Sequence, residues 1–421
     1  MDTIPFHFLM IAFDLTLYCL LIFWVIFNLK FRRDAIAESL YYDDFYSRGA
    51  VSGSMNSAGE PVLLRDKLGL SKFSWFLCGV LFCGFLLLLG IVFFAVIFRS
   101  NFGQCVVEGL TFHLGFYLLF ASVILFIRES YFLGVILFFC GFGVMFLGVD
   151  MLYIEPVNLV FEYYKIESPK LKSAVRIVFV ADIQTDDIGW YERKTLRMIM
   201  EAKPDLILLG GDYLQYYEGT IGVSTLPERF RQLFLEIPLD APLGAYAIPG
   251  NVDYSSPEEF KELFSETTVE PVFFSEMIDG LGVEEDKGPI DIRFLSVADS
   301  INGVKRAALS QSGNFTVVVG HYPNYAIKDY QFADQAPDLM LAGHTHGGQI
   351  YIPFWGPLRV KYTNRETIIT QDFLRGMKNF KNGGKLIITR GSGMERGWAP
   401  RIRFLCKPEI SVIDVIPSPK K

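Results

Sequence analysis

Four long apolar stretches in the first third of the chain constrain its fold more than any other feature. A helix needs about 20 apolar residues to cross a bilayer, and residues 8–27, 73–98, 109–127 and 131–154 each provide such a run. The whole chain is 51% hydrophobic and only 20% charged, which is too apolar for an ordinary soluble protein. The sequence therefore predicts an all-α region of about four transmembrane helices over residues 1–155 and a soluble domain over residues 156–421.

The basic residues predict how this membrane region is oriented. The loop between the first two stretches contains Lys30, Arg32, Arg33, Arg48, Arg65, Lys67 and Lys72, whereas the residues before the first stretch contain no Lys or Arg. Positively charged loops stay in the cytoplasm. An even number of spans then places the soluble domain on the other side. We expect an integral, multi-pass protein of the cell or inner membrane with an extracytoplasmic soluble domain.

The soluble part alternates short apolar runs with amphipathic and loop segments. The runs are rich in Val, Ile, Leu and Phe, and they predict strands at residues 176–181, 206–209, 245–248, 292–297, 316–319, 339–341, 385–389 and 409–415. Residues 191–202 have helical spacing and end before Pro204. Strands interleaved with helices predict an α/β fold.

Polar side chains of the kinds that bind metals follow several of these strands. They are Asp182 and Gln184, Asp212, Asn251 and Asp253, His321, and His344 and His346. Each group comes after a buried strand and a small residue. Because ligands gather beyond the carboxyl ends of strands in α/β sheets, we expect these side chains to converge.

The residue types in this group indicate the chemistry of the site. Three of the five histidines lie in two glycine-led loops, together with carboxylates and amides but no thiolate. Such donors suit Mn²⁺, Fe or Zn²⁺. They are too many for one tetrahedral ion, and two divalent ions could clamp a phosphate between them. The net charge of -7 argues against a nucleic-acid partner, which would need a basic surface.

The order of the motifs resembles that of the calcineurin-like metallophosphoesterases. That family has D-x-H, G-D, G-N-H-D, G-H and G-H-x-H, and this chain reads D-I-Q, G-D-Y, G-N-V-D, G-H-Y-P and G-H-T-H between residues 182 and 346. The run GHTHGGQI is similar to that of the membrane-associated YkuE-like branch, and spans before such a domain are similar to transmembrane proteins with a metallophosphoesterase domain. The resemblance implies a four-layer α/β/β/α sandwich.

The resemblance also implies roles for the matching residues. One metal ion would be held by Asp182, Gln184, Asp212 and His346, and the other by Asp212, Asn251, His321 and His344. Asp212 would bridge the two ions, and a metal-bridging hydroxide would be the nucleophile. Asp212, Asn251 and His321 are the expected catalytic residues. The implied activity is hydrolysis of a phosphoester or diphosphate, on a membrane-associated or amphipathic, possibly lipid-linked, substrate.

Two positions depart from the family pattern. Gln184 stands where the family has a histidine, and its neutral amide oxygen is a weaker donor; Asp186 or Asp187 could compensate. Val252 replaces the histidine of G-N-H-D, and loss of a general acid would cost about 10²–10⁴ in rate. We therefore expect a substrate with a good leaving group. The alternative is a weak or inactive metal-binding pseudoenzyme that serves as a membrane sensor or partner-binding module.

Residues outside the motifs carry weaker expectations. Arg396 and Arg401, with Arg403, could hold the substrate phosphate, because a guanidinium group can bind phosphate through two hydrogen bonds. Structural ion pairs are the alternative. Tyr322, Phe354 and Trp355 could form an apolar rim for a lipid tail, although ordinary packing is the expected role.

Overall fold

The computed structural model describes residues 106–418, with short gaps at 128, 216–224, 254–255, 283–285, 304–312, 331–335, 358–361, 365–366, 370 and 396–399. Two of its helical segments, Val106–Ile127 and Tyr131–Val157, are long and apolar enough to cross a membrane. They coincide with the expected spans 109–127 and 131–154. The expected spans 8–27 and 73–98 lie outside the described residues.

The two apolar segments form a hairpin whose contact surface is made by small residues. The first contains η1 (Gly109–His113) and α4 (Leu114–Ile127); the second contains α5 (Tyr131–Val149), η2 (Asp150–Ile154) and η3 (Glu155–Val157). The buried residues of α5 are Gly134, Gly141 and Gly148, which recur every seven positions on one face. Small residues let two helices approach closely in lipid. The large apolar side chains of α5, such as Phe132, Phe139 and Phe146, are exposed, as a hydrocarbon environment would favour.

The soluble part contains two six-stranded mixed sheets. The first has the order β1 (Val160–Ser168), β16 (Glu409–Pro417), β2 (Val175–Val180), β3 (Leu206–Leu209), β4 (Ala245–Ala247) and β5 (Val269–Pro271). The second has the order β14 (Gly376–Asn379), β15 (Lys385–Ile388), β9 (Leu339–Ala342), β8 (Phe315–Val319), β7 (Ile290–Phe294) and β6 (Glu276–Leu281). The neighbours β2, β3 and β4 are parallel, as are β8 and β9. Two short hairpins, β10 (Tyr351–Ile352) with β11 (Gly356–Pro357) and β12 (Tyr362–Asn364) with β13 (Thr367–Ile369), complete the strands described.

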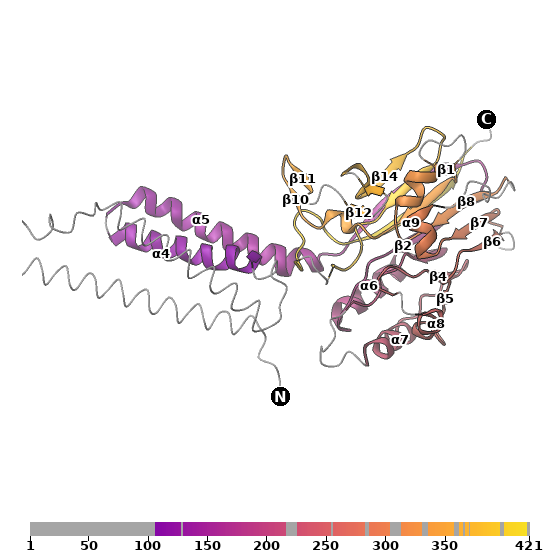
Figure 1. Cartoon of the computed structure of the whole chain (residues 1–421), viewed down its shortest axis with the longest axis horizontal. Coiled ribbons are helices and arrows are strands. Elements are labelled where there is room, and N and C mark those ends of the chain that lie inside the picture. The colour runs from indigo at the N-terminus through magenta and orange to yellow at the C-terminus, as the bar shows by residue number, and fades with distance from the viewer. Residues whose placement is uncertain are drawn as a thin grey trace, which may run out of the picture. The chain divides into compact units, whose positions relative to one another are not determined.

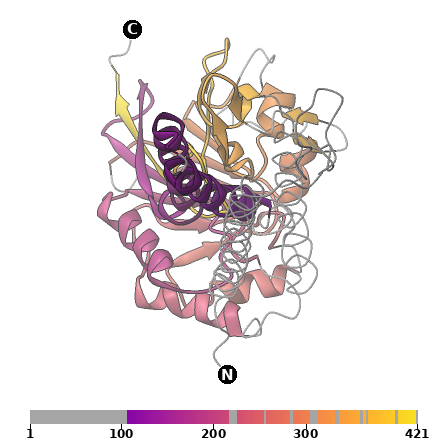
Figure 2. The same cartoon turned by 90° about the vertical axis from the view of Figure 1, so that its left-hand side faces the viewer.

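Successive side chains of each strand point to opposite faces of its sheet, and this alternation produces separate core layers. Phe179 and Leu208 of the first sheet meet Ile292 and Val317 of the second in a core between the sheets. On the other face of the first sheet, its strands pack against three helices, α6 (Trp190–Glu201), α7 (Leu226–Glu236) and α8 (Pro257–Leu263). Figures 1 and 2 show these helices gathered on one side of the strands. The outer face of the second sheet is covered by shorter segments that include Tyr325 and Phe380.

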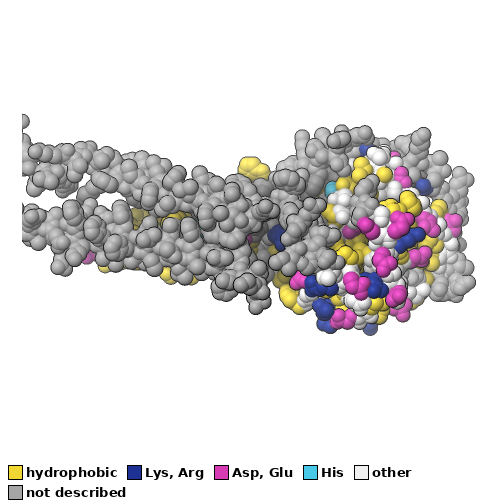
Figure 3. Space-filling view, turned by 60° about the horizontal axis from the view of Figure 1, so that its bottom comes forward, with side chains coloured by type: hydrophobic (Ala, Val, Ile, Leu, Met, Phe, Trp, Pro, Cys, Tyr) yellow, Lys and Arg dark blue, Asp and Glu magenta, His cyan; other side chains and the backbone are white. Residues whose placement is uncertain are grey.

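The α/β class expected from the sequence is confirmed by these mixed sheets, and all eight expected strands are present. One boundary is wrong. Residues 292–297 were expected as a strand, but β7 ends at Phe294 because Ser296 caps a helix, α9 (Val297–Asn302), by accepting a hydrogen bond from the backbone of Asp299. Figure 3 shows acidic and basic side chains interspersed with apolar ones on the described surface of the soluble part.

Candidate metal centre

Five loops at the carboxyl ends of parallel strands bring the predicted ligands into the fold. Asp182 and Gln184 follow β2, Asp212 follows β3, Asn251 follows β4, His321 follows β8, and His344 and His346 follow β9. The two sheets pack face to face with these strands at their centres. Loops from both sheets therefore meet at one edge of the sandwich.

Five of the predicted ligands share an unusual backbone conformation. Asp182, Gln184, Asp212, His344 and His346 have φ angles of 55°, 39°, 60°, 69° and 48°. Non-glycine residues rarely adopt this left-handed region, and such strain costs about 1–3 kcal/mol per residue. Folding offsets this cost where a functional site requires a side chain at one position. Five of the twelve non-glycine residues with positive φ among the described residues are thus predicted ligands, which makes this loop cluster the candidate functional site.

The four donors expected for the second metal ion lie together. Oδ1 of Asn251 is 3.1 Å from Nε2 of His321 and 2.9 Å from Nδ1 of His344. Nε2 of His321 lies 3.3 Å from Oδ2 of Asp212. Donor atoms of Asp212, His321 and His344 all lie within 4.8 Å of one another, a spacing suited to a common ion.

The hydrogen bond at the far side of His321 determines which ring nitrogen faces the cluster. Nδ1 donates to the backbone carbonyl of Gly210 over 2.8 Å. The neutral ring therefore carries its proton on Nδ1 and directs the Nε2 lone pair toward Asp212 and Asn251. Metal-binding histidines are commonly oriented in this way by a backbone carbonyl.

The buried carboxylate of Asp212 needs a positive charge close to it. Burial by itself would raise the pKa of Asp212, but the charge of His321 and its hydrogen bond lower that pKa to about 2. Burial by itself would lower the pKa of His321, but the charge of Asp212 raises it. Without a metal ion, a protonated His321 provides the positive charge that the buried carboxylate needs. A divalent ion could take over that role.

Asp182 and His346 lie in the same buried region. Both oxygens of Asp182 accept from the backbone N–H of His344 over 3.0 Å, and burial raises the pKa of its carboxyl to about 7. Burial and the charge of Arg403 lower the pKa of His346 to about 3. Its Nδ1 is buried and has no hydrogen-bond partner among the residues that the structure describes. A neutral imidazole nitrogen left without a partner fits a metal ligand, because burial of an unpaired acceptor is otherwise unfavourable.

Gln184 does not occupy its position as a histidine ligand would. Its side chain is fully buried, and its Nε2 donates to Oδ2 of Asp212 over 3.0 Å. The amide would have to turn over to present its oxygen to an ion beside Asp212. The donor set expected for the first metal ion is therefore weaker than the one expected for the second.

Asp186 and Asp187 do not replace the missing histidine. Asp186 forms an ion pair with Arg401 over 2.8 Å, and Asp187 forms one with Arg229 over 2.6 Å. The ion pair gives Arg401 a structural partner rather than a free guanidinium for phosphate. Arg396 lies outside the described residues.

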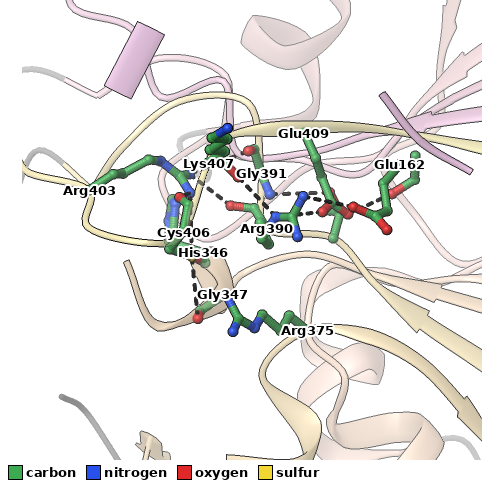
Figure 4. A network of polar contacts seen from close by, with 12 residues as sticks. Glu162, His346, Gly347, Arg375, Arg390, Gly391, Arg403, Cys406, Lys407 and Glu409 are labelled. Atoms are coloured by element: carbon green, nitrogen blue, oxygen red, sulfur yellow. Dashed lines mark hydrogen bonds and ion pairs between the residues drawn. The ribbon is translucent and has the colours of Figure 1, made fainter. Parts of the chain in front are cut away.

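Arg403 does not hold substrate phosphate, contrary to one expectation. Its side chain is completely buried and donates to the backbone carbonyls of Arg390, Gly391, Gly393 and Cys406. Figure 4 shows it reaching into the loop beside Cys406 and Gly391. Gly393 donates its own N–H to the carbonyl of Asp182 over 2.7 Å. Arg403 thus stabilises the loop on which the Asp182 backbone rests.

Asp253 has a supporting role that its position after Asn251 did not reveal. Its carboxylate accepts from three backbone N–H groups, those of Asp212 at 2.6 Å and of Tyr213 and Gly250 at 2.9 Å. Gly250 has to be a glycine, because a Cβ there would collide with the side chain of Asp212. Asp253 therefore fixes the loop that carries Asp212. The G-N-V-D spacing was the only sequence signal of this role.

Three aromatic residues were expected to pack in an ordinary way, and two do not. Tyr322 is buried and stacks on His344 with ring centroids 3.8 Å apart. Phe354 and Trp355 are exposed at the turn between β10 and β11. The packing expectation is wrong for these two residues because the short hairpin projects them away from the sheets.

Known proteins resemble the part of the chain that carries this cluster. Residues 175–348 match the family described as calcineurin-like phosphoesterase. The metallophosphoesterase YkuE of Bacillus subtilis, which is described as uncharacterized, is 28% identical over 274 residues, covering 62% of this chain and 86% of that protein. The phosphodiesterase YaeI of Escherichia coli is 25% identical over 224 residues, covering 52% of this chain and 72% of that protein. LpxG of Chlamydia trachomatis, described as a UDP-2,3-diacylglucosamine pyrophosphatase, is 25% identical over 294 residues, covering 58% and 84%.

Proposed function

We propose that this chain, whose residues 175–348 belong to the calcineurin-like phosphoesterase family, is a metal-dependent hydrolase of phosphoester or diphosphate bonds with a dinuclear centre. The observation that carries the proposal is the convergence of donor atoms from the buried Asp212 and His321 and the half-buried His344. Asp182, Gln184 and His346 would complete the first metal site, and Asn251 would complete the second. Divalent ions held there would polarise a phosphoryl oxygen and make water a stronger nucleophile.

The residues around the cluster indicate how a substrate would be handled. With an ion bound, His321 would keep only the proton on its Gly210 side, so its inward nitrogen would act as a ligand and not as a proton donor. Val252 has no titratable group, and its backbone N–H is engaged with Oδ1 of Asp212 over 3.0 Å. Neither residue can protonate a leaving group. We therefore propose a substrate whose leaving group departs as a stable anion, such as a diphosphate or an activated phosphodiester.

The apolar helices suggest where such a substrate would be found. α4 and α5 expose large apolar side chains along their length, and the metallophosphoesterase region follows them directly in the chain. We propose a multi-pass membrane protein whose metallophosphoesterase domain, residues 156–421, is extracytoplasmic and acts on an amphipathic or lipid-linked phosphorylated substrate. A reporter fused to the C-terminus would test the sidedness: activity of a periplasmic reporter supports the proposal, and activity of a cytoplasmic one contradicts it.

A second function is favoured by one specific contact. The hydrogen bond from Gln184 to Asp212 occupies the carboxylate that would bridge two ions. Together with Val252, it would suit a metal-binding pseudoenzyme that acts as a sensor or a partner-binding module.

Hydrolysis of bis-p-nitrophenyl phosphate separates the two functions, because its leaving group needs no general acid. The purified full-length chain would be titrated with Mn²⁺ beside Asp212→Asn, with the exposed Asp240→Asn as the matched control. Metal-dependent turnover that Asp212→Asn loses and Asp240→Asn keeps supports the hydrolase. Turnover no higher than that of Asp212→Asn with Mn²⁺, Fe²⁺ and Zn²⁺ supports the pseudoenzyme.

A further inference from the structure

The β10–β11 hairpin carries a run of four exposed apolar residues at its tip. Ile352, Pro353, Phe354 and Trp355 are all exposed, with Phe354 at 110% and Trp355 at 79% of their reference surface. The backbone N–H of Trp355 bonds to the carbonyl of Ile352 over 3.1 Å and closes the turn. Single exposed apolar residues are ordinary on soluble proteins, but four in succession indicate a surface that contacts a partner.

The base of this hairpin is fixed, so the tip is not a loose loop. The backbone N–H of Tyr351 donates to the carbonyl of Phe404 over 2.8 Å, and the guanidinium of Arg375 lies 4.2 Å from the centre of the Tyr351 ring. Pro357, at the other strand, is buried close to Gly348. The hairpin therefore projects from the turn that carries His346 (labelled with Arg375 in Figure 4).

The segment that contains Phe404 also contacts the end of the second apolar helix. Next to Phe404, the backbone N–H of Arg403 donates to the carbonyl of Met151 over 3.0 Å, and the N–H of Cys406 donates to the Glu155 carboxylate. Consecutive Cα atoms are about 3.8 Å apart. The residue that bonds to the hairpin, Phe404, and the residue that bonds to the helix end, Arg403, are thus neighbours in the sequence. The hairpin base lies where the candidate span Tyr131–Val157 ends.

We infer that the tip Ile352–Trp355 inserts into the headgroup layer of the same bilayer leaflet from which this helix emerges. Aromatic side chains concentrate at that depth of membrane proteins, roughly 5–10 Å into the boundary between headgroups and acyl chains. The inference rests on the membrane attachment in the proposed function. It adds that the His344–His346 turn is held at the level of the lipid phosphates by a second contact, besides the helices.

The shape and position of the tip favour a bilayer over other partners. A convex turn can enter a lipid layer, but it offers no groove to enclose a single lipid tail. Beyond Ile154, the structure describes eight large exposed apolar side chains, and four of them, Ile352, Phe354, Trp355 and Leu405, lie on this hairpin and the segment bonded to it. The exposed Tyr153 and Ile154 at the helix end are apolar as well. Exposed apolar side chains thus occur both at the helix end and on the hairpin that is bonded to the same segment.

Tryptophan fluorescence of the full-length chain in lipid nanodiscs tests this placement. The discs would contain phosphatidylcholine and phosphatidylglycerol with brominated acyl chains, which quench tryptophan at close range. Trp355→Phe removes the reporter at the tip, and Trp190→Phe removes a matched, exposed tryptophan on α6. Both substitutions lie at exposed positions, so neither should alter folding. The emission lost with each variant isolates the signal of one residue.

We expect the Trp355 signal to be quenched by the brominated lipid and protected from aqueous iodide, and the Trp190 signal to show the reverse. Iodide quenching of Trp355 without lipid quenching would overturn the inference. Protection from both quenchers that appears only with two chains per disc would assign the tip to a second copy instead. Loss of lipid quenching on adding a competing short-chain phospholipid would assign it to a single lipid tail. Hydrolysis of bis-p-nitrophenyl phosphate in the same discs reports on the proposed function separately, and co-elution of the chain with lipid reports on the membrane attachment.

Discussion

The side-chain amide of Gln184 donates a hydrogen bond to the Asp212 carboxylate over 3.0 Å. Asp212 is the residue shared by both donor sets, and it also accepts from the backbone of Val252 and faces His321. A histidine at position 184 would offer a lone pair to an ion beside Asp212, whereas the amide presents a proton donor. In the proposed dinuclear centre the two metal positions would therefore be unequal, with the one formed by Asp212, Asn251, His321 and His344 the stronger.

Replacing Gln184 by histidine should strengthen the weaker position. We expect Gln184→His to tighten the binding of Mn²⁺ at this weaker position by about 10-fold or more, the scale on which changes around a metal site alter affinity. Turnover of bis-p-nitrophenyl phosphate should rise with it at limiting Mn²⁺. Isothermal titration would measure the affinity, with Gln232→His on the exposed face of α7 as the matched control. An unchanged affinity of the weaker position would show that residue 184 does not face the ion.

Asp253 should matter through Asp212 rather than by touching substrate. Its carboxylate accepts from the backbone of Gly250, Asp212 and Tyr213, and an amide in its place could accept with only one oxygen. We expect Asp253→Asn to weaken Mn²⁺ binding by about 10–100-fold, with turnover restored by excess Mn²⁺. Loss of turnover that no Mn²⁺ concentration restores would mean that Asp253 acts in another way.

Metal affinity should increase with pH, because protons and metal ions compete for the same groups. In the metal-free cluster, burial raises the pKa of Asp182 to about 7, and Asp212 raises that of His321 to about 9. Both pKa values are raised, so both groups hold protons at low pH and lose them as the pH rises. Between about pH 7 and 9, metal binding displaces the proton of His321, so the affinity rises tenfold per pH unit. Below about pH 7, metal binding displaces the protons of both His321 and Asp182. Calorimetry in buffers of different ionisation enthalpy counts these protons. An affinity that does not vary with pH would contradict the assignment of these residues as ligands.

Much of the fold could be predicted from the sequence because buried parallel strands read as short apolar runs. The segments Leu206–Leu209 and Phe315–Val319 are completely buried, and such runs leave little ambiguity. β1 escaped prediction because Val160–Ser168 is an edge strand whose Glu and Lys residues alternate irregularly with aromatic ones. The ligand loops were predictable because each follows a strand directly.

Properties that depend on tertiary contacts could not be predicted. Arg403 looks in sequence like one more arginine of a basic tail, and only the fold reveals four backbone carbonyls around it. The run Ile352–Trp355 has the composition of a core segment, yet the turn after Ile352 exposes it. The direction of the Gln184 amide depends on where Asp212 lies, which the residue type does not determine.

The role of Arg403 gives a prediction about stability. Arg403→Leu would leave several buried carbonyl groups without donors, and each costs about 1–3 kcal/mol. We therefore expect the free energy of unfolding to fall by roughly 3–5 kcal/mol. Arg403→Lys should recover only part of this, because an ammonium group cannot reach carbonyls in several directions. Denaturant unfolding of the full-length chain in detergent would measure both. The exposed Arg197→Leu serves as the control. A loss for Arg403→Leu no larger than for the control would contradict the structural role.

The number of Mn²⁺ ions bound per chain tests the central claim, that the loop cluster is a metal centre, most directly. Equilibrium dialysis of the full-length chain, followed by elemental analysis, would compare wild type with His321→Ala and with Asp240→Asn, whose carboxylate is exposed and belongs to none of the motifs. We predict one tightly held and one weakly held ion for wild type and Asp240→Asn, and loss of the tight ion in His321→Ala. Equal Mn²⁺ content in all three proteins would show that the cluster binds no metal and would contradict the account.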